Sequence, residues 1–365
     1  MNWYLIDKIE TLDTPFLALY KDRMEKNIRM AISMVKDPAR LRPHVKTNKI
    51  AEACRMMMEA GISKFKCATI AEAEMLGMIK AKDVLLAYQP VGPKAARLLA
   101  LAKQYPETGF SCVVDDTQAA AHLSELFLAA GKRLPVYIDL NTGMNRTGIL
   151  PANAAALFDA LQPLKGIEVT GVHLYDGHLT ETNIRQRQLD SDKGFDEAMK
   201  AVAVMEQKIN GALTVVAGGS PTFSTHVGRD VECSPGTFVF WDWGYKTKYP
   251  DAPFEYAALV VARVISIVNK DTITLDLGYK AVAAESPFPR VYFLNAPEAQ
   301  AVSQSEEHLV LKVADSGIYK TGDTLYGTPL HICPSVALYE KATVIEDHKI
   351  IASWKVIARD RSITI

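Results

Sequence analysis

The sequence predicts a two-domain α/β protein, in which a (β/α)8 barrel of the TIM type is followed by an antiparallel β domain. Short apolar runs alternate with helical patterns from Phe16 to about residue 242. After about residue 245 the pattern changes to short β-branched runs, and 365 residues are enough for two domains. We therefore place the barrel at residues 14–245 and the β domain at 246–365, with residues 1–13 as a candidate addition to the β domain.

Nine apolar segments are candidate strands for the eight places in the barrel. Most are separated by ten or more residues with helical spacing, such as Thr117–Ala130 and Glu181–Ile209. Strands that are apolar throughout and separated by helices are typical of a parallel sheet covered on both faces. One end strand should therefore join the other domain, and the sequence does not say which. The candidates are Phe16–Tyr20, Leu41–Lys46, Lys64–Thr69, Asp83–Tyr88, Ser111–Asp115, Pro135–Asn141, Ile167–Leu174, Leu213–Gly218 and Thr237–Trp241.

The second domain contains β-branched runs separated by turn residues. Asn269–Asp271 and Asp347–Lys349 have the composition of hairpin turns. Helical periodicity is weak and is limited to Pro297–Ser303. The candidate strands are Val260–Val268, Thr272–Leu277, His308–Val313, Thr324–Tyr326 and Thr343–Ile345.

Composition and charge argue against a nucleic-acid-binding protein, a membrane-spanning protein and a disulfide-rich protein. The formal net charge of −1 provides no basic field for nucleic acid. The most apolar stretch, Tyr256–Val268, contains Arg263 and is too short to span a bilayer. An odd number of scattered cysteines, five in all, favours a reducing compartment over a disulfide framework. We expect a cytoplasmic protein that binds a small molecule and neither nucleic acid nor membrane.

Lys46 closes the second candidate strand and is a candidate catalytic residue. A lysine at the mouth of a strand can form a Schiff base with an aldehyde cofactor if its amine is desolvated and its pKa is lowered. Burial and the cationic neighbours Arg42, His44 and Lys49 would supply these conditions. A solvated basic edge is the alternative.

The segment Gly218–Thr222, after the eighth candidate strand, lies where barrels commonly bind phosphate. Its glycines allow backbone N–H groups to approach an anion, and Ser220 and Thr222 add hydroxyl donors. A tight turn is the alternative. Ser234–Thr237 would add a second contact by the same logic.

Three further side chains stand at strand ends. Arg146 would offer a fixed cation to a phenolate or carboxylate, and an ordinary exposed arginine in a loop is the alternative. Tyr175 and His178 would stack on a ring or transfer protons, although a single aromatic or histidine at a strand end more often packs or caps.

His331 and Cys333 form a candidate metal pair. In an extended segment, residues i and i+2 point to the same side, so imidazole and thiolate would converge. This donor pair suits zinc, and two protein ligands suit a catalytic ion with open positions better than a structural one. Alternatively, Cys333 is a buried small hydrophobe and His331 a surface residue.

These segments together resemble the alanine-racemase-like (fold-type III) PLP enzymes, and within them the D-threonine aldolase/D-serine dehydratase family. The resemblance runs in family order from about residue 14 to the C-terminus. The matching segments are Pro43–Lys49, Gly143–Gly148, Gly171–His178, Gly218–Ser220, Glu232 with Pro235–Thr237, Asp276–Ala281, Ser305–His308 and His331–Pro334.

The resemblance implies that Lys46 holds pyridoxal 5'-phosphate (PLP), that Arg146 faces its phenolic oxygen and that Tyr175 lies against its ring. The residues that would bind its phosphate are Gly219, Ser220, Gly236 and Thr237. His331 and Cys333 would bind a divalent metal. The dehydratases of the family carry His-x-Cys with zinc, whereas its aldolases carry His-x-Asp with manganese or a similar ion. A homodimer with shared active sites is also implied.

Two departures from alanine racemase argue against racemisation. Ile50 stands where racemases have a tyrosine, and Ser234 stands where they place an arginine against the pyridine nitrogen. A neutral hydroxyl there would leave the ring a moderate electron sink. We expect a PLP- and metal-dependent lyase of D-β-hydroxy amino acids, an aldolase ahead of a dehydratase, with His173 and His178 as candidate bases. An amino-acid racemase and a non-catalytic PLP-binding protein are the alternatives.

Overall fold

The computed structural model describes residues 2–365, which divide into two compact units, each built from several stretches of chain. The first unit comprises the residues up to Met30, Thr47–Glu52 and Thr237–Arg359, and the second comprises Ala31–Lys46, Ala53–Gly236 and Asp360–Ile365. The domain limits drawn from the sequence stay a prediction, and residue 1 of the segment 1–13 lies outside the described residues.

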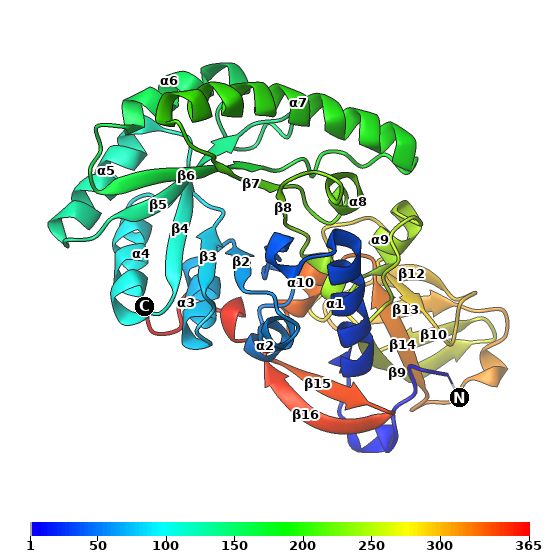
Figure 1. Ribbon diagram of the computed structural model, residues 1–365. Coiled ribbons are helices and arrows are strands. Elements are labelled where there is room, and N and C mark those ends of the chain that lie inside the picture. Colours follow the sequence, from blue (N-terminus) through cyan, green and yellow to red (C-terminus); the bar gives the residue numbers. More distant parts are fainter. Residues whose placement is uncertain (1) are drawn as a thin grey trace. The chain divides into compact units, whose positions relative to one another are not determined.

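The second unit is built on seven parallel strands in sequential order, which fan out in Figure 1. Residues 41–46 connect its two edges through parallel bridges, Leu41 to Cys233 and His44 to Lys66. Because Pro43 has no N–H, this segment makes isolated bridges rather than a full ladder. The strands are β2 (Lys64–Cys67), β3 (Asp83–Leu86), β4 (Gly109–Val114), β5 (Leu134–Leu140), β6 (Ile167–Leu174), β7 (Thr214–Ala217) and β8 (Glu232–Cys233).

Helices cover the outer face of this sheet (Figure 1). Three of these helices begin after a residue whose side chain accepts from free backbone N–H groups, and the other two begin with a proline. Asn183, for example, accepts from the N–H groups of Arg185 and Gln186. This cap explains why the last helix begins at Ile184 and not at Glu181 as predicted. The helices are α3 (Ile70–Met78), α4 (Pro93–Gln104), α5 (Thr117–Ala129), α6 (Pro151–Leu161) and α7 (Ile184–Ile209).

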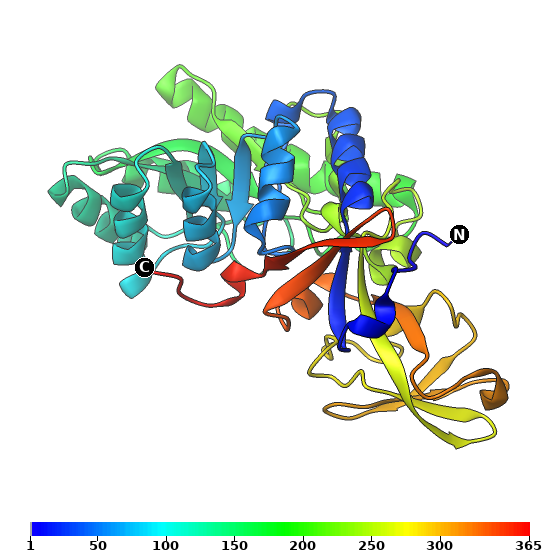
Figure 2. The ribbon, with the colours of Figure 1, turned by 90° about the horizontal axis from the view of Figure 1, so that it is seen from below.

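The C-terminal segment ends beside α4 in Figures 1 and 2, where Arg97 donates to the Ile365 carbonyl oxygen at 2.6 Å.

The predicted fold class, a barrel-like α/β unit followed by a mostly antiparallel β unit, is confirmed, with two corrections to its strands. Of the nine candidates, it is the first, β1 (Phe16–Tyr20), that joins the other sheet. The last candidate, Thr237–Trp241, is not a strand: Thr237–Val239 form a 3-10 turn, and the barrel ends instead on the two-residue β8. A short buried apolar run fits either conformation, so its composition does not decide between them.

The first unit is built on a nine-stranded sheet in the order β12-β13-β10-β9-β1-β15-β16, with β14 on β9 and β11 on β14. Among its pairs only β1 with β15 is parallel. The strands after β1 are β9 (Ala258–Asn269), β10 (Thr272–Leu275), β11 (Val291–Phe293), β12 (Gln300–Gln304), β13 (Leu309–Lys312), β14 (Thr324–Pro329), β15 (Lys341–Glu346) and β16 (Lys349–Lys355).

Both predicted hairpin turns of this unit are confirmed. The β9–β10 turn lies at Lys270–Asp271, and the β15–β16 turn has positive φ values at Asp347 and His348, as a type I′ turn requires. The helical interpretation of Pro297–Ser303 is wrong, because Gln300–Gln304 pairs with β13 as a strand.

The other α-helices within the described residues are α1 (Lys21–Val35), α2 (Ala51–Glu59), α8 (Phe223–His226), α9 (Trp243–Lys248) and α10 (Ile332–Val336).

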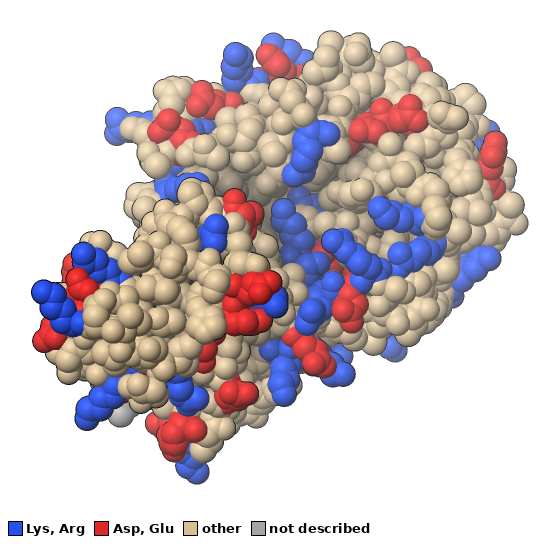
Figure 3. Space-filling view, turned by 180° about the vertical axis from the view of Figure 1, so that it is seen from behind, with Lys and Arg blue, Asp and Glu red and all other residues tan. Residues whose placement is uncertain are grey.

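Three structural features bear on charge, membrane-spanning helices and disulfides. Figure 3 shows Lys and Arg interspersed with Asp and Glu, in keeping with a formal net charge of −1. Between residues 2 and 365 no helix has the length and apolar character needed to cross a membrane. Within the described residues no disulfide joins any of the five cysteines.

Candidate functional site

A cavity of about 510 Å³ lies within the second unit and brings two predicted site residues together. Lys46 reaches it from the segment that closes the barrel, and Arg146 reaches it from the loop after β5. Its volume is in the range of small-molecule sites. The lining residues are His44, Lys46, Ala68, Ala87, Tyr88, Gln89, Val91, Val113, Asp115, Asp139, Arg146 and Thr147.

Three basic side chains lie against the ring of Tyr175. Nζ of Lys46 lies 5.9 Å from the ring centroid, Nζ of Lys66 5.8 Å and Cζ of Arg146 4.8 Å. Lys66 was not predicted from the sequence. The sequence offered only a weak signal, because Lys66 alternates with Lys64 in a short strand and a solvated strand face has the same pattern.

Two glycines permit the position of Tyr175. A Cβ at Gly177 would lie 2.2 Å from the Tyr175 ring, and a Cβ at Gly219 would lie 2.8 Å from it. Any larger residue at either place would displace the ring. The backbone therefore packs closely around an aromatic ring that the three cations already flank.

The Gly218–Thr222 loop follows β7 as predicted, and Gly218 has a φ of +76°, which favours glycine. Ser220 Oγ accepts from the N–H of Gly236 at 3.1 Å, so the two predicted phosphate segments meet. The Thr222 hydroxyl is fully buried, donates to Asp176 at 2.5 Å and accepts from the N–H of Gly219 at 3.3 Å. These two hydrogen bonds hold the backbone of the loop in place.

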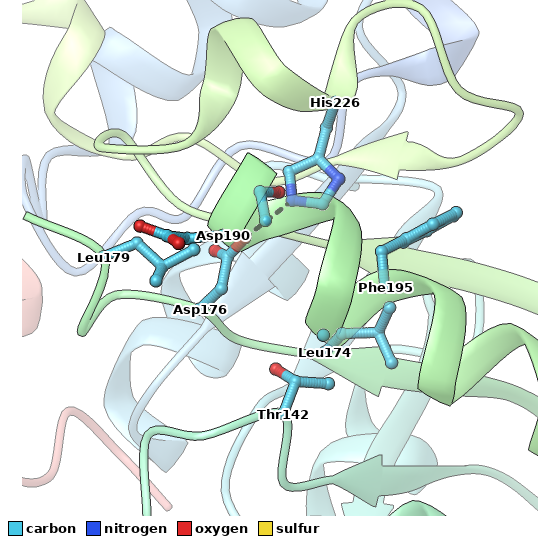
Figure 4. A pocket seen from close by; sticks show the side chains of 9 residues that line it. Thr142, Leu174, Asp176, Leu179, Asp190, Phe195 and His226 are labelled. Carbon is cyan, nitrogen blue, oxygen red and sulfur yellow. Dashed lines mark hydrogen bonds and ion pairs between the residues drawn. The ribbon is translucent and has the colours of Figure 1, made fainter. Parts of the chain in front are cut away.

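Asp176 links this loop to His226, which ends α8. Figure 4 shows the imidazole directed at the carboxylate, with Nε2 2.8 Å from Oδ2. Burial would raise the pKa of Asp176, but hydrogen bonds from His226 and Thr222 outweigh it and lower this pKa. Asp176, Thr222 and His226 therefore form a buried hydrogen-bonded group that supports the loop.

The two candidate bases have different surroundings. His173 is buried on β6, with Nδ1 2.7 Å from Asp139 Oδ1 and Nε2 3.2 Å from Lys66 Nζ. Burial, and then the charge of Lys66, lower its pKa, so the ring is neutral near pH 7. His178 lies exposed in the loop after β6, close to Gly143, where a Cβ would be 2.7 Å from Nε2.

The remaining predicted cofactor residues fall in both units. In the second unit, buried Ser234 donates from Oγ to the Arg42 carbonyl oxygen at 2.8 Å. Thr237 belongs to the first unit, where Oγ1 lies 3.6 Å from Cys333 Sγ. Of the residues predicted for PLP, only Lys46 and Arg146 line the cavity.

His331 and Cys333 lie at the start of α10, and the predicted extended segment is wrong for Cys333. His331 is the N-cap and is extended (φ −136°), whereas Cys333 is in the first helical turn. Their side chains still converge. Burial lowers the pKa of His331, but a hydrogen bond to Cys333 and another to Glu285 outweigh it and raise the pKa to about 9. Nδ1 is 2.6 Å from Glu285 Oε1.

Asp242 fixes the backbone of this pair. Its buried carboxylate accepts from the N–H of Ile332 at 3.0 Å and from the N–H of Tyr245 at 2.8 Å, which caps α9. Thr47, the residue after Lys46 in the chain, places Oγ1 3.1 Å from Cys333 Sγ in the same unit. Within residues 2–365 no group of three or more His, Cys, Asp or Glu side chains is arranged to hold a metal.

These residues fit the groups that the family implies. The cations around Tyr175 and the glycines that make room for its ring are suited to an anionic aromatic cofactor. An imidazole and a thiol on one turn provide the donors of a catalytic zinc site, in which the other positions remain open.

Comparisons with known proteins agree with this geometry. Residues 20–241 match the alanine racemase N-terminal domain model, and residues 257–345 match the D-serine dehydratase domain model. The chain is 25% identical to D-threonine aldolase of Arthrobacter sp. over 97% of its own length and 94% of that protein. It is also 25% identical to D-threo-3-hydroxyaspartate dehydratase of Delftia sp. (strain HT23), over 96% of this chain and 98% of that one.

Among solved structures, the D-threonine aldolase of Filomicrobium marinum superposes with a TM-score of 0.89 at 26% identity, over 96% of both chains. These relatives are lyases of D-β-hydroxy amino acids. The chain therefore belongs to the alanine racemase N-terminal domain family, with a D-serine dehydratase domain after the barrel.

Proposed function

We propose that this protein is a PLP- and divalent-metal-dependent lyase of D-β-hydroxy amino acids, of the D-threonine aldolase type. The observation that carries the proposal is the cavity of the second unit, which Lys46 and Arg146 both line. The same two side chains also lie against the ring of Tyr175. The similarity to aldolases and dehydratases over nearly the whole chain supports the reaction class.

Each residue has a role that its chemistry permits. Lys46 would hold PLP covalently and release it to the substrate amine. Arg146 would neutralise the phenolate of PLP, and Tyr175 would support its ring. The phosphate would be bound by Gly219, Ser220, Gly236 and Thr237. PLP withdraws electrons from the bonds of the substrate Cα when it is bound.

His331 and Cys333 would hold the metal, with zinc ahead of manganese because of the sulfur donor. The metal would polarise the β-oxygen as a Lewis acid. Glu285 accepts from His331 Nδ1, which leaves Nε2 as the metal donor of this imidazole.

Two reactions are open to this set of residues. In retro-aldol cleavage a base removes the β-hydroxyl proton, and the Cα–Cβ bond breaks to give glycine and an aldehyde. In dehydration Lys46 removes the Cα proton, and the β-hydroxyl leaves. We place cleavage first and dehydration second; the cysteine in the metal pair favours the second. His178, exposed in its loop, is the candidate base for the first reaction, because both nitrogens of His173 are engaged.

The experiment is to incubate the purified protein with D-threonine or D-serine, with and without a chelator, and to measure glycine, acetaldehyde, keto acids and the L-enantiomer. Chelator-sensitive glycine and acetaldehyde are expected from D-threonine. L-enantiomer that appears despite the chelator would favour a racemase, and PLP binding without turnover would favour a non-catalytic PLP-binding protein. We also propose a cytoplasmic homodimer, which sedimentation of the PLP-loaded protein would test.

A further inference from the structure

Two lysines on β2 face the barrel interior but differ in their partners. Lys64 and Lys66 are two residues apart in the strand, so their side chains point to the same face. Lys64 forms an ion pair with Glu232. Over residues 2–365, Lys66 has no carboxylate within ion-pair distance, although its side chain is only 2% exposed.

The surroundings of Lys66 fix its amine in place. Asp139 accepts from His173 Nδ1, so His173 Nε2 is the acceptor for the Lys66 amine at 3.2 Å. An ammonium group has three donors, and this contact uses one of them. The amine lies 5.8 Å from the Tyr175 ring, nearly the same distance as Lys46 on the cavity side.

The surrounding charges do not compensate a cation at this position. Lys46 and Arg42 act against protonation of Lys66, whereas Asp139 and Asp176 favour it. Asp176 is already bonded to His226. Burial and the charge of Lys46 lower the pKa of Lys66 to about 7. A buried amine without an anionic partner loses its proton readily and regains it when an anion comes near.

We propose that Lys66 supplies a conditional positive charge to this cavity: it takes up a proton when an oxyanion binds beside Lys46 and Arg146. The inference rests on the proposed function, because it takes the oxyanion from PLP or from the carboxylate of the amino-acid substrate. Lys66 acts through space and through His173, so it is a positioning residue.

The test measures proton uptake on binding, by calorimetry at pH 8 in buffers of different ionisation enthalpy. One arm titrates PLP into the apoprotein. The other titrates D-alanine, which has no β-hydroxyl, into the PLP-loaded protein. Lys66→Met is compared with the unaltered protein and with Lys82→Met, an exposed lysine of the same unit. Proton exchange at Lys46 is common to all three proteins, so the difference between them isolates Lys66.

We expect that in one of the two titrations, either with PLP or with D-alanine, Lys66→Met takes up about one proton less per bound molecule than either comparison protein. A difference with PLP identifies the cofactor oxyanion, and a difference only with D-alanine identifies the substrate carboxylate. Equal uptake by all three proteins in both arms overturns the role of Lys66 while PLP binding still stands. If PLP binds to none of them, the proposed function fails first. Thermal unfolding of Lys66→Met verifies that it folds.

Discussion

Two groups of buried charge in the barrel interior contrast sharply. In the first, Arg42 donates two hydrogen bonds to Asp83, at 2.6 and 2.9 Å, and one to Glu232 at 2.6 Å. Lys64 completes this group through Glu232. Two cations therefore meet two carboxylates, and the pKa of Arg42 is raised because its hydrogen bonds and ion pairs outweigh its burial.

In the second group, Lys46, Lys66 and Arg146 surround Tyr175, and the nearby carboxylate Asp139 is bonded to His173. Between residues 2 and 365, none of these three basic side chains forms an ion pair with a carboxylate. A buried charge without a partner costs stability, so such a group persists where a ligand completes it. The comparison separates a fully paired group, which we expect to stabilise the barrel, from an incompletely paired group, where we propose that the cofactor binds.

The largest expected effect comes from removing the central amine of the incomplete group. Lys46→Ala should lower lyase activity by at least about 10³-fold, because a covalent catalytic group acts together with its neighbours. The absorbance band near ~420 nm, which a lysine–PLP link would give, should also disappear. Lys82→Met is the control. A band that survives in Lys46→Ala and can be reduced onto the chain would show that the lysine assignment is wrong.

A substitution in the paired group should lower the free energy of unfolding rather than change cofactor binding. Glu232→Gln leaves Arg42 and Lys64 with one carboxylate fewer, and breaking a buried pair costs about 3–5 kcal/mol. Urea unfolding of the apoprotein measures this cost. A loss below ~1 kcal/mol would contradict the structural role of this group.

Lys66→Met should raise the free energy of unfolding, whereas Glu232→Gln should lower it. The unfolded chain keeps the proton of this lysine to about pH 10.4, whereas the folded chain releases it near pH 7. Unfolding between these values takes up a proton, so the wild-type apoprotein loses about 1.4 kcal/mol for each pH unit of acidification relative to the variant. Unfolding at pH 7, 8 and 9 should show the variant more stable, with the difference shrinking as the pH rises. A constant difference would contradict this.

The first unit also contains one buried carboxylate with backbone partners and one exposed carboxylate paired with a histidine. The carboxylate of Asp242 is used by two backbone N–H groups, whereas Glu285 and His331 form an exposed pair. Glu285→Gln should weaken zinc binding about 10–100-fold, because the carboxylate orients the imidazole. Competition with a chromophoric chelator measures this affinity without any turnover. Unchanged affinity, with Glu298→Gln as an exposed control, would show that Glu285 has no such role.

Local pattern was enough to predict much of the fold. The alternation of apolar runs and helical spacing located β6 (Ile167–Leu174) with its correct limits, and turn composition located two hairpins of the β unit, β9–β10 and β15–β16. Strands β8, β11, β12 and β16 were missed, since short or exposed strands carry little periodicity. Lys46 and Arg146 were found because they stand at strand ends, where parallel barrels place their functional residues.

The sequence by itself determined the barrel, the β unit and the motif residues, because periodicity and turn chemistry depend on neighbours in the chain. Only the tertiary structure decided that β1 joins the nine-stranded sheet, that Cys333 is in a helical turn and that Lys66 lies against the ring of Tyr175. The reason is the distance along the chain between partners: Lys66 meets His173 across 107 positions, and Arg42 meets Glu232 across 190. Whether a buried charge is paired or left for a ligand depends on such contacts.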